Sequence, residues 1–226
     1  MFVGHYSAAL AAKAAEPRAP LWSYVIGCQL LDVGWAVFIM TGLEKAAVDE
    51  SLPGSPLILY RMPYTHSLPA AVGWSILGGV VAKYALKLPR RAAVAIGLVV
   101  FSHWVADFLV HRPDLKLWYR GPVVGLGLWN FPVLEEALEI GLLGIAAVFW
   151  TAWRVKNGRR AWPAAVFMTF LLALQIVALG APEGGGRIQM GLVTLAAYLV
   201  AALVAWLVER GPVDAGERLP GAPQRA

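Results

Sequence analysis

The chain is built from long apolar stretches separated by short polar segments, and the apolar runs are much longer than a strand. Six of them reach the roughly 20 mostly apolar residues that a helix needs to cross the hydrocarbon core of a bilayer, which is about 30 Å thick. No segment keeps the two-residue alternation of a half-buried strand. We therefore predict an all-α membrane bundle of six transmembrane helices, in a single domain over residues 1–210. The predicted spans cover residues 21–43, 64–86, 92–111, 133–153, 162–180 and 188–208.

The composition excludes several other classes of protein. Of the 226 residues, 59% are hydrophobic and only 15% are charged, whereas an average soluble domain has roughly 25% charged residues. The chain therefore lacks the polar side chains that would cover a water-facing surface. Such hydrophobicity also argues against disorder and against nucleic-acid binding as the main function. The single cysteine, Cys28, cannot form an internal disulfide. Membrane lipids are the expected surroundings of this chain, and no nucleic-acid partner is expected.

The basic residues are distributed unevenly between the two sides that six spans would define. Thirteen Lys and Arg residues lie on the side of the two termini and six on the opposite side. By the positive-inside rule, both termini are expected in the cytoplasm and the loops 44–63, 112–132 and 181–187 outside. Residues 211–226, rich in Gly, Pro and charge, are predicted to form a disordered cytoplasmic tail.

The first 16 residues are apolar and Ala-rich, but a helix of that length reaches only about halfway across a bilayer. They lack the basic n-region of a signal peptide. Two interpretations remain open. The segment is either an interfacial helix that lies along the membrane surface, or a re-entrant half-helix that starts at mid-membrane depth beside His5 and leaves at Lys13 and Arg18.

Few ionisable residues lie within the apolar stretches, and they gather toward the outer half of the predicted bundle. A charged group in hydrocarbon costs several kcal/mol, so the groups retained there usually face a cavity or one another and mark a functional site. In this chain they are Asp32, His66, His103, Asp107, His111, Glu135, Glu136 and Glu139.

His103, Asp107 and His111 stand four residues apart in the third apolar stretch. Residues four apart differ by about 40° around a helix, so these three form one stripe. An imidazole followed one turn later by a carboxylate can hold one metal ion, or two neighbouring ions along the stripe. The same spacing arises in hydrogen-bonded structural pairs, but burying both groups within a membrane span without a ligand is far more costly.

The four histidines add a second argument for a metal. Three of them project to the outer half of the bundle, and His5 joins them only if the first segment is re-entrant. Histidines combined with carboxylates form a mixed nitrogen and oxygen set that suits zinc, with manganese or iron as substitutes. We therefore predict a site for one or two zinc ions. The predicted metal ligands are His5, Asp32, His66, His103, Asp107 and His111.

Three further residues are candidates for catalysis. Glu135 and Glu139 could each serve as a general base or as an additional ligand. Arg112 follows His111 and could bind an anionic group of a substrate, although its guanidinium could equally extend to the lipid headgroups. Nearby, residues 121–132 are apolar but too short to span, so they form either a re-entrant lid over the site or an interfacial loop.

Several blocks of the sequence together resemble a known family. MPYTHSL at 62–68, SHWVADFLVHRPDL at 102–115 and GLGLWN at 125–130 resemble blocks found in a family of uncharacterised bacterial integral membrane proteins. The opening residues and QLLDVGW at 29–35 fit the same family, so the resemblance covers roughly residues 1–140. The chain is more distantly similar to the inner-membrane metal-dependent hydrolases that include a LexA-regulated protein. This resemblance implies a multi-pass protein of the bacterial inner membrane.

The distant family has an early His, a Pro-Asp-x-Asp block, a His-Arg-Gly-x-Thr-His-Ser block and a Ser-His-x-x-x-Asp block. Leu31 replaces the proline, Gly34 replaces the second aspartate, and Arg61 and Met62 stand where the other His and Arg would fall. These departures imply fewer metal ions, or ligands drawn from His111 and Glu135 instead. The ligand order is also similar to that of zinc-dependent phospholipase C, which implies phosphoester chemistry. The resemblance implies metal-binding roles for His5, Asp32, His66, His103 and Asp107.

The expected function is a membrane-embedded, metal-dependent hydrolase that acts on a phosphoester or ester, with a lipid-linked substrate that reaches the site laterally. Two alternatives remain. One is a metal transporter or proton-coupled transporter, and the other is a structural membrane protein stapled by a metal. Transporters often carry broken helices in both halves, whereas here the ionisable residues cluster before residue 140 and only Gln175 is strongly polar in the middle of the last two stretches. The sequence leaves the substrate and the oligomeric state open.

Overall fold

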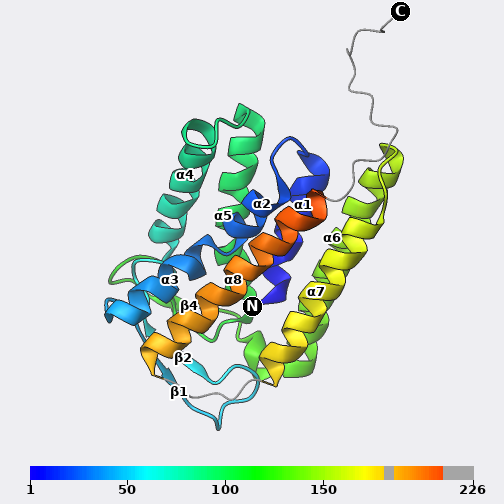
Figure 1. Cartoon of the computed structure of the whole chain (residues 1–226). Coiled ribbons are helices and arrows are strands. Elements are labelled where there is room, and N and C mark those ends of the chain that lie inside the picture. The colour runs from blue at the N-terminus through cyan, green and yellow to red at the C-terminus, as the bar shows by residue number, and fades with distance from the viewer. Residues whose placement is uncertain (181–185, 211–226) are drawn as a thin grey trace, which may run out of the picture.

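The computed structural model describes residues 1–180 and 186–210. The predicted disordered tail at 211–226 lies outside the described residues. The described chain is mostly helical, and Figure 1 shows the helices gathered into one bundle. Its α-helices are α1 (Tyr6–Ala15), α2 (Leu21–Cys28), α3 (Leu30–Thr41), α4 (Leu68–Tyr84), α5 (Arg90–Val110), α6 (Pro132–Lys156), α7 (Trp162–Leu179) and α8 (Arg187–Glu209).

Among the described helices, α5, α7 and α8 are long and apolar enough to cross a membrane. A fourth span would arise if α2 and α3, which are bent by 52° at a short break, form one crossing. The apolar helix α4 has 17 residues, and α6 covers the predicted span at 133–153. The all-α class and the presence of helices long and apolar enough to cross a membrane are therefore confirmed, while the count of six spans and their arrangement across a membrane stay predictions.

The first segment lies within the bundle. Residues Val3–His5 form a 3-10 helix, η1, which leads directly into α1. The side chains of Tyr6 and Leu10 are fully buried, and α1 packs against α6, α2 and α5. The amino terminus accordingly lies in the middle of the molecule (Figure 1). One face of α1 is buried and the other, with Ala11 and Ala15, is exposed, so the choice between the interfacial and the re-entrant interpretation stays a prediction.

The break between α2 and α3 falls at Gln29, whose backbone leaves the helical conformation (φ −110°, ψ 9°). The last carbonyls of a helix have no intrahelical partner, and here the carbonyl of Cys28 accepts a hydrogen bond from the Nδ1 atom of His103 at 2.7 Å. The break also starts a new helix just before Asp32, which lies in the first turn of α3. The bend therefore supplies both a carbonyl acceptor and a carboxylate at the same depth of the bundle.

Two small hairpins occupy the loops that were predicted to lie outside. Strand β1 (Lys45–Val48) pairs antiparallel with β2 (Leu57–Arg61), and β3 (Leu115–Lys116) pairs with β4 (Val123–Val124). Strands of two to five residues are too short for their alternation to be recognised in the sequence, which is why the sequence pattern missed them. The first hairpin lies at the end of the bundle where α8 begins (Figure 1).

Lys13, counted above among the cytoplasmic basic residues, is buried at the opposite end of the bundle. Its ammonium lies 2.6 Å from Oε1 of Glu209 at the end of α8 and donates to the carbonyls of Pro17 and Ala19 at 2.9 and 2.7 Å. The other carboxylate oxygen of Glu209 accepts from the backbone N–H of Leu21. This ion pair ties the first helix, the turn after it and the last helix together.

Candidate metal centre

The six predicted ligands come together in one buried cluster, although they come from four separate parts of the chain. His103 and Asp107 lie one turn apart on α5, and the other four come from η1, the first turn of α3, the residue before the N-cap of α4, and the end of α5. The negative charge of Asp32 is stabilised by the dipole of α3, because this residue lies in the first turn of that helix. The six residues are His5, Asp32, His66, His103, Asp107 and His111.

Four of these residues point their ligand atoms at a common centre. The Nε2 atom of His66 lies 3.2 Å from Oδ1 of Asp32 and 3.5 Å from Oδ2 of Asp107. The Nε2 atom of His103 lies 3.6 and 3.1 Å from the same two oxygens. Ligand atoms bound at about 2.0–2.1 Å to a tetrahedral zinc ion lie about 3.3 Å from one another. The four contacts therefore have the length of the edges of a tetrahedral zinc site.

The second oxygen of Asp107 faces a second pair of histidines. Its Oδ1 atom lies 3.1 Å from Nε2 of His5 and 3.5 Å from Nε2 of His111. The rings of His5 and His103 are stacked, with centroids 3.8 Å apart and planes 7° from parallel. The amino group of Met1 lies 3.3 Å from the same Oδ1 atom. Asp107 thus presents each carboxylate oxygen to a different part of the cluster.

Hydrogen bonds at the far side of two rings determine which nitrogen carries the proton. A carbonyl oxygen can only accept, so His103 donates from Nδ1 to Cys28. An ionised carboxylate likewise only accepts, so His111 donates from Nδ1 to Oδ1 of Asp114 at 2.9 Å. In their neutral forms both rings therefore point a bare Nε2 lone pair at the carboxylate of Asp107.

Two acceptors that face each other in a buried site repel unless a cation lies between them. Nε2 of His103, Oδ2 of Asp107 and both ring nitrogens of His5 are buried and have no hydrogen-bond partner. Buried polar atoms without partners are costly. The residues that could bind a metal also form two groups of three, and within each group the ligand atoms lie within 4.8 Å of one another. The groups are His5–His103–Asp107 and Asp32–His66–His103. The residues present therefore fit a metal ion, with zinc matching the nitrogen and oxygen donors.

Tyr198 on α8 is a site residue that the sequence analysis did not identify. Its hydroxyl donates to Oδ2 of Asp32 at 2.6 Å, which leaves Oδ1 of that carboxylate facing the histidines. The side chain of Asp32 is 17% exposed, whereas those of the other five cluster residues are at most 4% exposed. Asp32 therefore marks the side from which the cluster can be reached. The one signal of Tyr198 in the sequence is a phenol within a mostly apolar stretch.

The predicted catalytic glutamates lie beside the cluster. The carboxylate of Glu139 accepts hydrogen bonds from the backbone N–H groups of Phe2, at 2.9 Å, and Gly4, at 2.8 Å. It therefore holds the segment that carries His5. Glu135 is buried on the same face of α6. Glu136, in contrast, accepts from Nε2 of Gln175 on α7 at 2.9 Å.

Arg112 does not contact the cluster directly. Its guanidinium donates to Oδ1 of Asn130 and to the carbonyls of Ser55 and Pro53, at 2.9, 2.9 and 2.6 Å. These bonds join the tip of the first hairpin to the loop that follows the second one. A role in binding an anionic substrate stays a prediction.

The segment at 121–132 covers one side of the site, next to His111. The ring of Trp129, which belongs to the 3-10 helix η2 (Leu128–Asn130), is buried and lies 4.0 Å from the ring of His111, centroid to centroid. Gly125 approaches the backbone so closely that a Cβ atom there would collide with the carbonyls of His111 and Arg112. The choice between a re-entrant lid and an interfacial loop stays a prediction.

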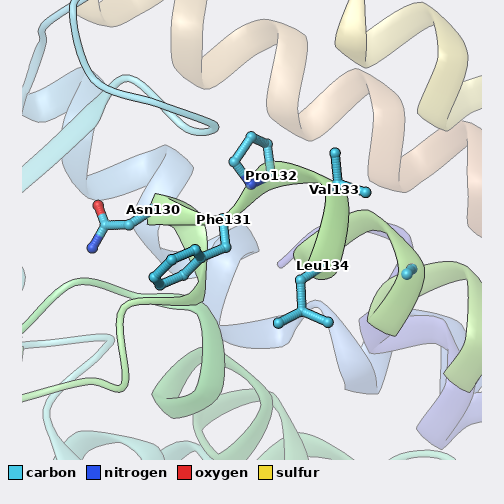
Figure 2. A pocket seen from close by; sticks show the side chains of 6 residues that line it. Asn130, Phe131, Pro132, Val133 and Leu134 are labelled. Atoms are coloured by element: carbon cyan, nitrogen blue, oxygen red, sulfur yellow. The ribbon is translucent and has the colours of Figure 1, made fainter.

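A shallow apolar groove opens on the surface beside this segment. It is lined by Asn130, Phe131, Pro132, Val133, Leu134 and Ala137, and Figure 2 shows these side chains around the start of α6. None of them belongs to the histidine and aspartate cluster. The large exposed fractions of Phe131, Val133 and Leu134, 63%, 85% and 58%, suit contact with lipid.

No protein-family model, no curated protein and no solved structure matches the chain. The family resemblance described above therefore stays a prediction, and the functional argument depends on the site itself.

Proposed function

We propose that the protein is a membrane-embedded, metal-dependent hydrolase whose centre is the cluster of histidines and aspartates. The observation that carries the proposal is the set of four contacts, 3.1 to 3.6 Å long, between two histidine nitrogens and two aspartate oxygens. Hydrogen-bonded structural pairs would present a donor to each acceptor. Because His103 donates from Nδ1, its neutral ring turns an acceptor toward Asp107, and a metal ion would satisfy both acceptors as a proton on Nε2 would.

Asp32, His66, His103 and Asp107 would hold a first zinc ion, and His5 and His111 would hold a second at the opposite oxygen of Asp107. Support for two ions comes from Asp107, whose two carboxylate oxygens face different pairs of histidine nitrogens, as a carboxylate shared by two ions would. Zinc bound in this way supplies Lewis acidity and a water of lowered pKa. Manganese or iron could occupy the same ligands.

The chain's own residues would orient the substrate at the side of Asp32. Tyr198 holds that carboxylate through one oxygen, and the surrounding buried rings exclude water from the rest of the cluster. Glu139 fixes the segment that carries His5 and so keeps that imidazole stacked on His103. A positioned water beside these groups suits hydrolysis of a phosphoester or an ester.

A lipid-linked substrate is the class that this location favours. Asp32 lies on α3, part of the bent pair that could form one membrane crossing, and α3 packs against the membrane-crossing helix α8. A linkage in a lipid headgroup could therefore reach Asp32 from the side without leaving the membrane. Large apolar side chains such as Leu199 and Val193 are exposed on α8, as expected for a lipid-facing helix.

Elemental analysis of the detergent-purified protein is the first test. We expect wild type to retain zinc and His103→Ala and Asp107→Ala to lose it. Glu136→Gln is the matched control, because Glu136 is an α6 carboxylate bonded to Gln175 outside the cluster, and it should retain zinc like wild type. Wild type that carries no metal and takes up none after incubation with zinc would refute the proposal.

Mass spectrometry of lipid extracts incubated with the metal-loaded protein tests the hydrolytic activity. Products that appear with wild type and are absent with Asp107→Ala would support it. Unchanged lipids together with zinc flux into liposomes would instead favour a transporter. Unchanged lipids, no flux and a large loss of stability on metal removal would favour a structural role for the metal.

A further inference from the structure

Glu44 is a buried carboxylate that no part of the proposed chemistry uses. It follows the left-handed C-cap Gly42 at the end of α3 and is 1% exposed. Its Oε1 atom accepts hydrogen bonds from the backbone N–H groups of Tyr64 and Thr65, at 2.8 and 3.0 Å. Its Oε2 atom lies 2.7 Å from the hydroxyl of Thr65. A carboxylate with three hydrogen-bond donors is held firmly in one orientation.

Thr65 connects this carboxylate to the cluster. Its hydroxyl oxygen also lies 2.7 Å from the Nδ1 atom of His66. The hydroxyl has one proton, and an ionised carboxylate can only accept, so that proton points to Glu44. The Nδ1 atom of His66 must then be the donor to the hydroxyl oxygen. In the neutral ring the remaining nitrogen, Nε2, is then bare and faces Asp32 and Asp107.

We propose that Glu44, acting through Thr65, is a positioning group that fixes His66 in the tautomer able to bind a metal ion. Metal-binding histidines commonly donate their other ring N–H to a carboxylate or carbonyl, and here a hydroxyl is inserted between the ring and the carboxylate. His103 and His111 donate directly to Cys28 and Asp114. The importance of this tautomer for metal binding rests on the proposed function, while the tautomer itself does not.

The arrangement also links the segments that carry two of the proposed ligands, Asp32 and His66. Glu44 follows the helix that carries Asp32, and its partners Tyr64 and Thr65 immediately precede His66. The backbone carbonyl of His66 is held from a third side, by Nε1 of Trp104 on α5 at 3.0 Å. The Glu44 carboxylate therefore joins the end of α3 to the segment that begins α4, outside the ligand atoms themselves.

The substitution Glu44→Gln tests the direction of the hydrogen bonds. The amide oxygen can still accept from the backbone N–H groups of Tyr64 and Thr65, which leaves the NH₂ group facing the Thr65 hydroxyl. That hydroxyl would then donate to Nδ1 of His66 and move the ring proton to Nε2. We expect zinc affinity to fall about 10- to 100-fold, measured by competition with a chelator.

Substitutions of Thr65 separate this direction from a purely structural effect. Thr65→Ser keeps the hydroxyl and should bind zinc like wild type. Thr65→Val removes it, so His66 loses its imposed tautomer, and affinity should fall less than in Glu44→Gln. The double variant Glu44→Gln with Thr65→Val should recover to the level of Thr65→Val, because the reversed chain of bonds is broken. If the losses simply add, or if Thr65→Ser behaves like Thr65→Val, the inference is wrong.

Nitrogen-15 NMR of the histidine rings in metal-free protein provides the second readout. We expect His66 to be protonated at Nδ1 in wild type and at Nε2 in Glu44→Gln. Glu50→Gln, an exposed glutamate in the same loop, is the control and should leave both tautomer and zinc affinity unchanged. Wild type that binds no zinc but has the expected tautomers would overturn the proposed function alone. An unchanged tautomer in Glu44→Gln would overturn the role of Glu44.

Discussion

Asp107 is the residue on which most of the cluster depends. Its two carboxylate oxygens contact four imidazole rings, with Nε2 distances between 3.1 and 3.5 Å, and it is 1% exposed. An unpaired carboxylate at that depth would be strongly destabilising. His66, His103 and His111 turn Nε2 toward it because their Nδ1 atoms are already bonded to backbone or side-chain oxygens. Hydrogen bonds at the edge of the cluster thus orient the rings whose Nε2 atoms face Asp107.

Tyr198→Phe removes the one hydroxyl that holds Asp32 while keeping the ring and its packing. We expect zinc to remain bound with roughly 10-fold lower affinity, since partners of a ligand typically contribute 10- to 100-fold. Thermal stability in detergent should change little. Chelator competition measures the affinity, and Tyr24→Phe is the matched control, because Tyr24 donates to the carbonyl of Glu16 outside the cluster. Equal affinities in both variants would contradict this role.

At the scale of elements, the site depends on irregular segments between helices. The α2–α3 break supplies the Cys28 carbonyl, η1 carries His5, and the residue before the α4 N-cap is His66. A regular helix satisfies its own backbone groups and has none to offer. Broken helices at membrane depth are tolerated where protein buries them, and these breaks are buried by α5, α6 and α8. The irregularities are therefore part of how the cluster is built.

Glu139→Gln tests how firmly η1 is held. The amide oxygen can accept only part of the hydrogen bonds that the carboxylate takes from Phe2 and Gly4, and hydrogen bonds to charged groups contribute about 1.5–3 kcal/mol each. We expect a lower melting temperature in detergent and a loss of the second metal ion, which needs His5, with the first retained. Glu136→Gln should show neither effect. Loss of both ions without a stability change would point to direct metal ligation by Glu139.

For the whole molecule, one end of the bundle carries the site and the other is closed by an ion pair. The hairpins, Arg112 and Trp129 cover the end with the site. At the other end Lys13 and Glu209 join the first and last of the described helices. The segment that carries His5 is therefore attached at both ends. Glu139 binds its first residues, and Lys13 joins its end to the last helix.

Lys13→Met should destabilise the bundle by about 3 kcal/mol, because removing one partner of a buried pair leaves the other charge uncompensated. The double variant with Glu209→Gln should recover part of that loss. Chemical denaturation in mixed micelles measures both. The control is Arg18→Met, whose exposed pair with Glu16 is expected to matter little. A double variant less stable than Lys13→Met would contradict this account.

Metal removal should lower stability, since an ion that binds only the folded state stabilises it by mass action. At free zinc about 1,000 times the dissociation constant, the gain is about 4 kcal/mol. We expect a chelator to lower the melting temperature of wild type and zinc to restore it. Asp107→Asn should melt at one temperature with or without zinc. A wild-type protein indifferent to both additions would count against a bound metal.

The sequence determined the class of the protein and the identity of the six cluster residues. Long apolar runs are a local property, and an ionisable group within such a run is informative because charge in hydrocarbon is costly. The four-residue spacing of His103, Asp107 and His111 is likewise local, because it follows from the geometry of one helix. The two hairpins escaped detection because their strands are too short to show a local alternation. The composition of the first segment could not separate its two interpretations.

Only the tertiary structure decided which groups orient the cluster. Tyr198 and Asp32 are 166 residues apart, Glu139 and Gly4 are 135 apart, and Glu44 reaches Thr65 across a hairpin. A tyrosine, a glutamate or a backbone carbonyl carries no local mark of such a contact. Their hydrogen bonds exist because packing of apolar faces brings the helices together, and packing is a property of the whole chain. The sequence therefore revealed the candidate ligands, and the fold revealed what holds them.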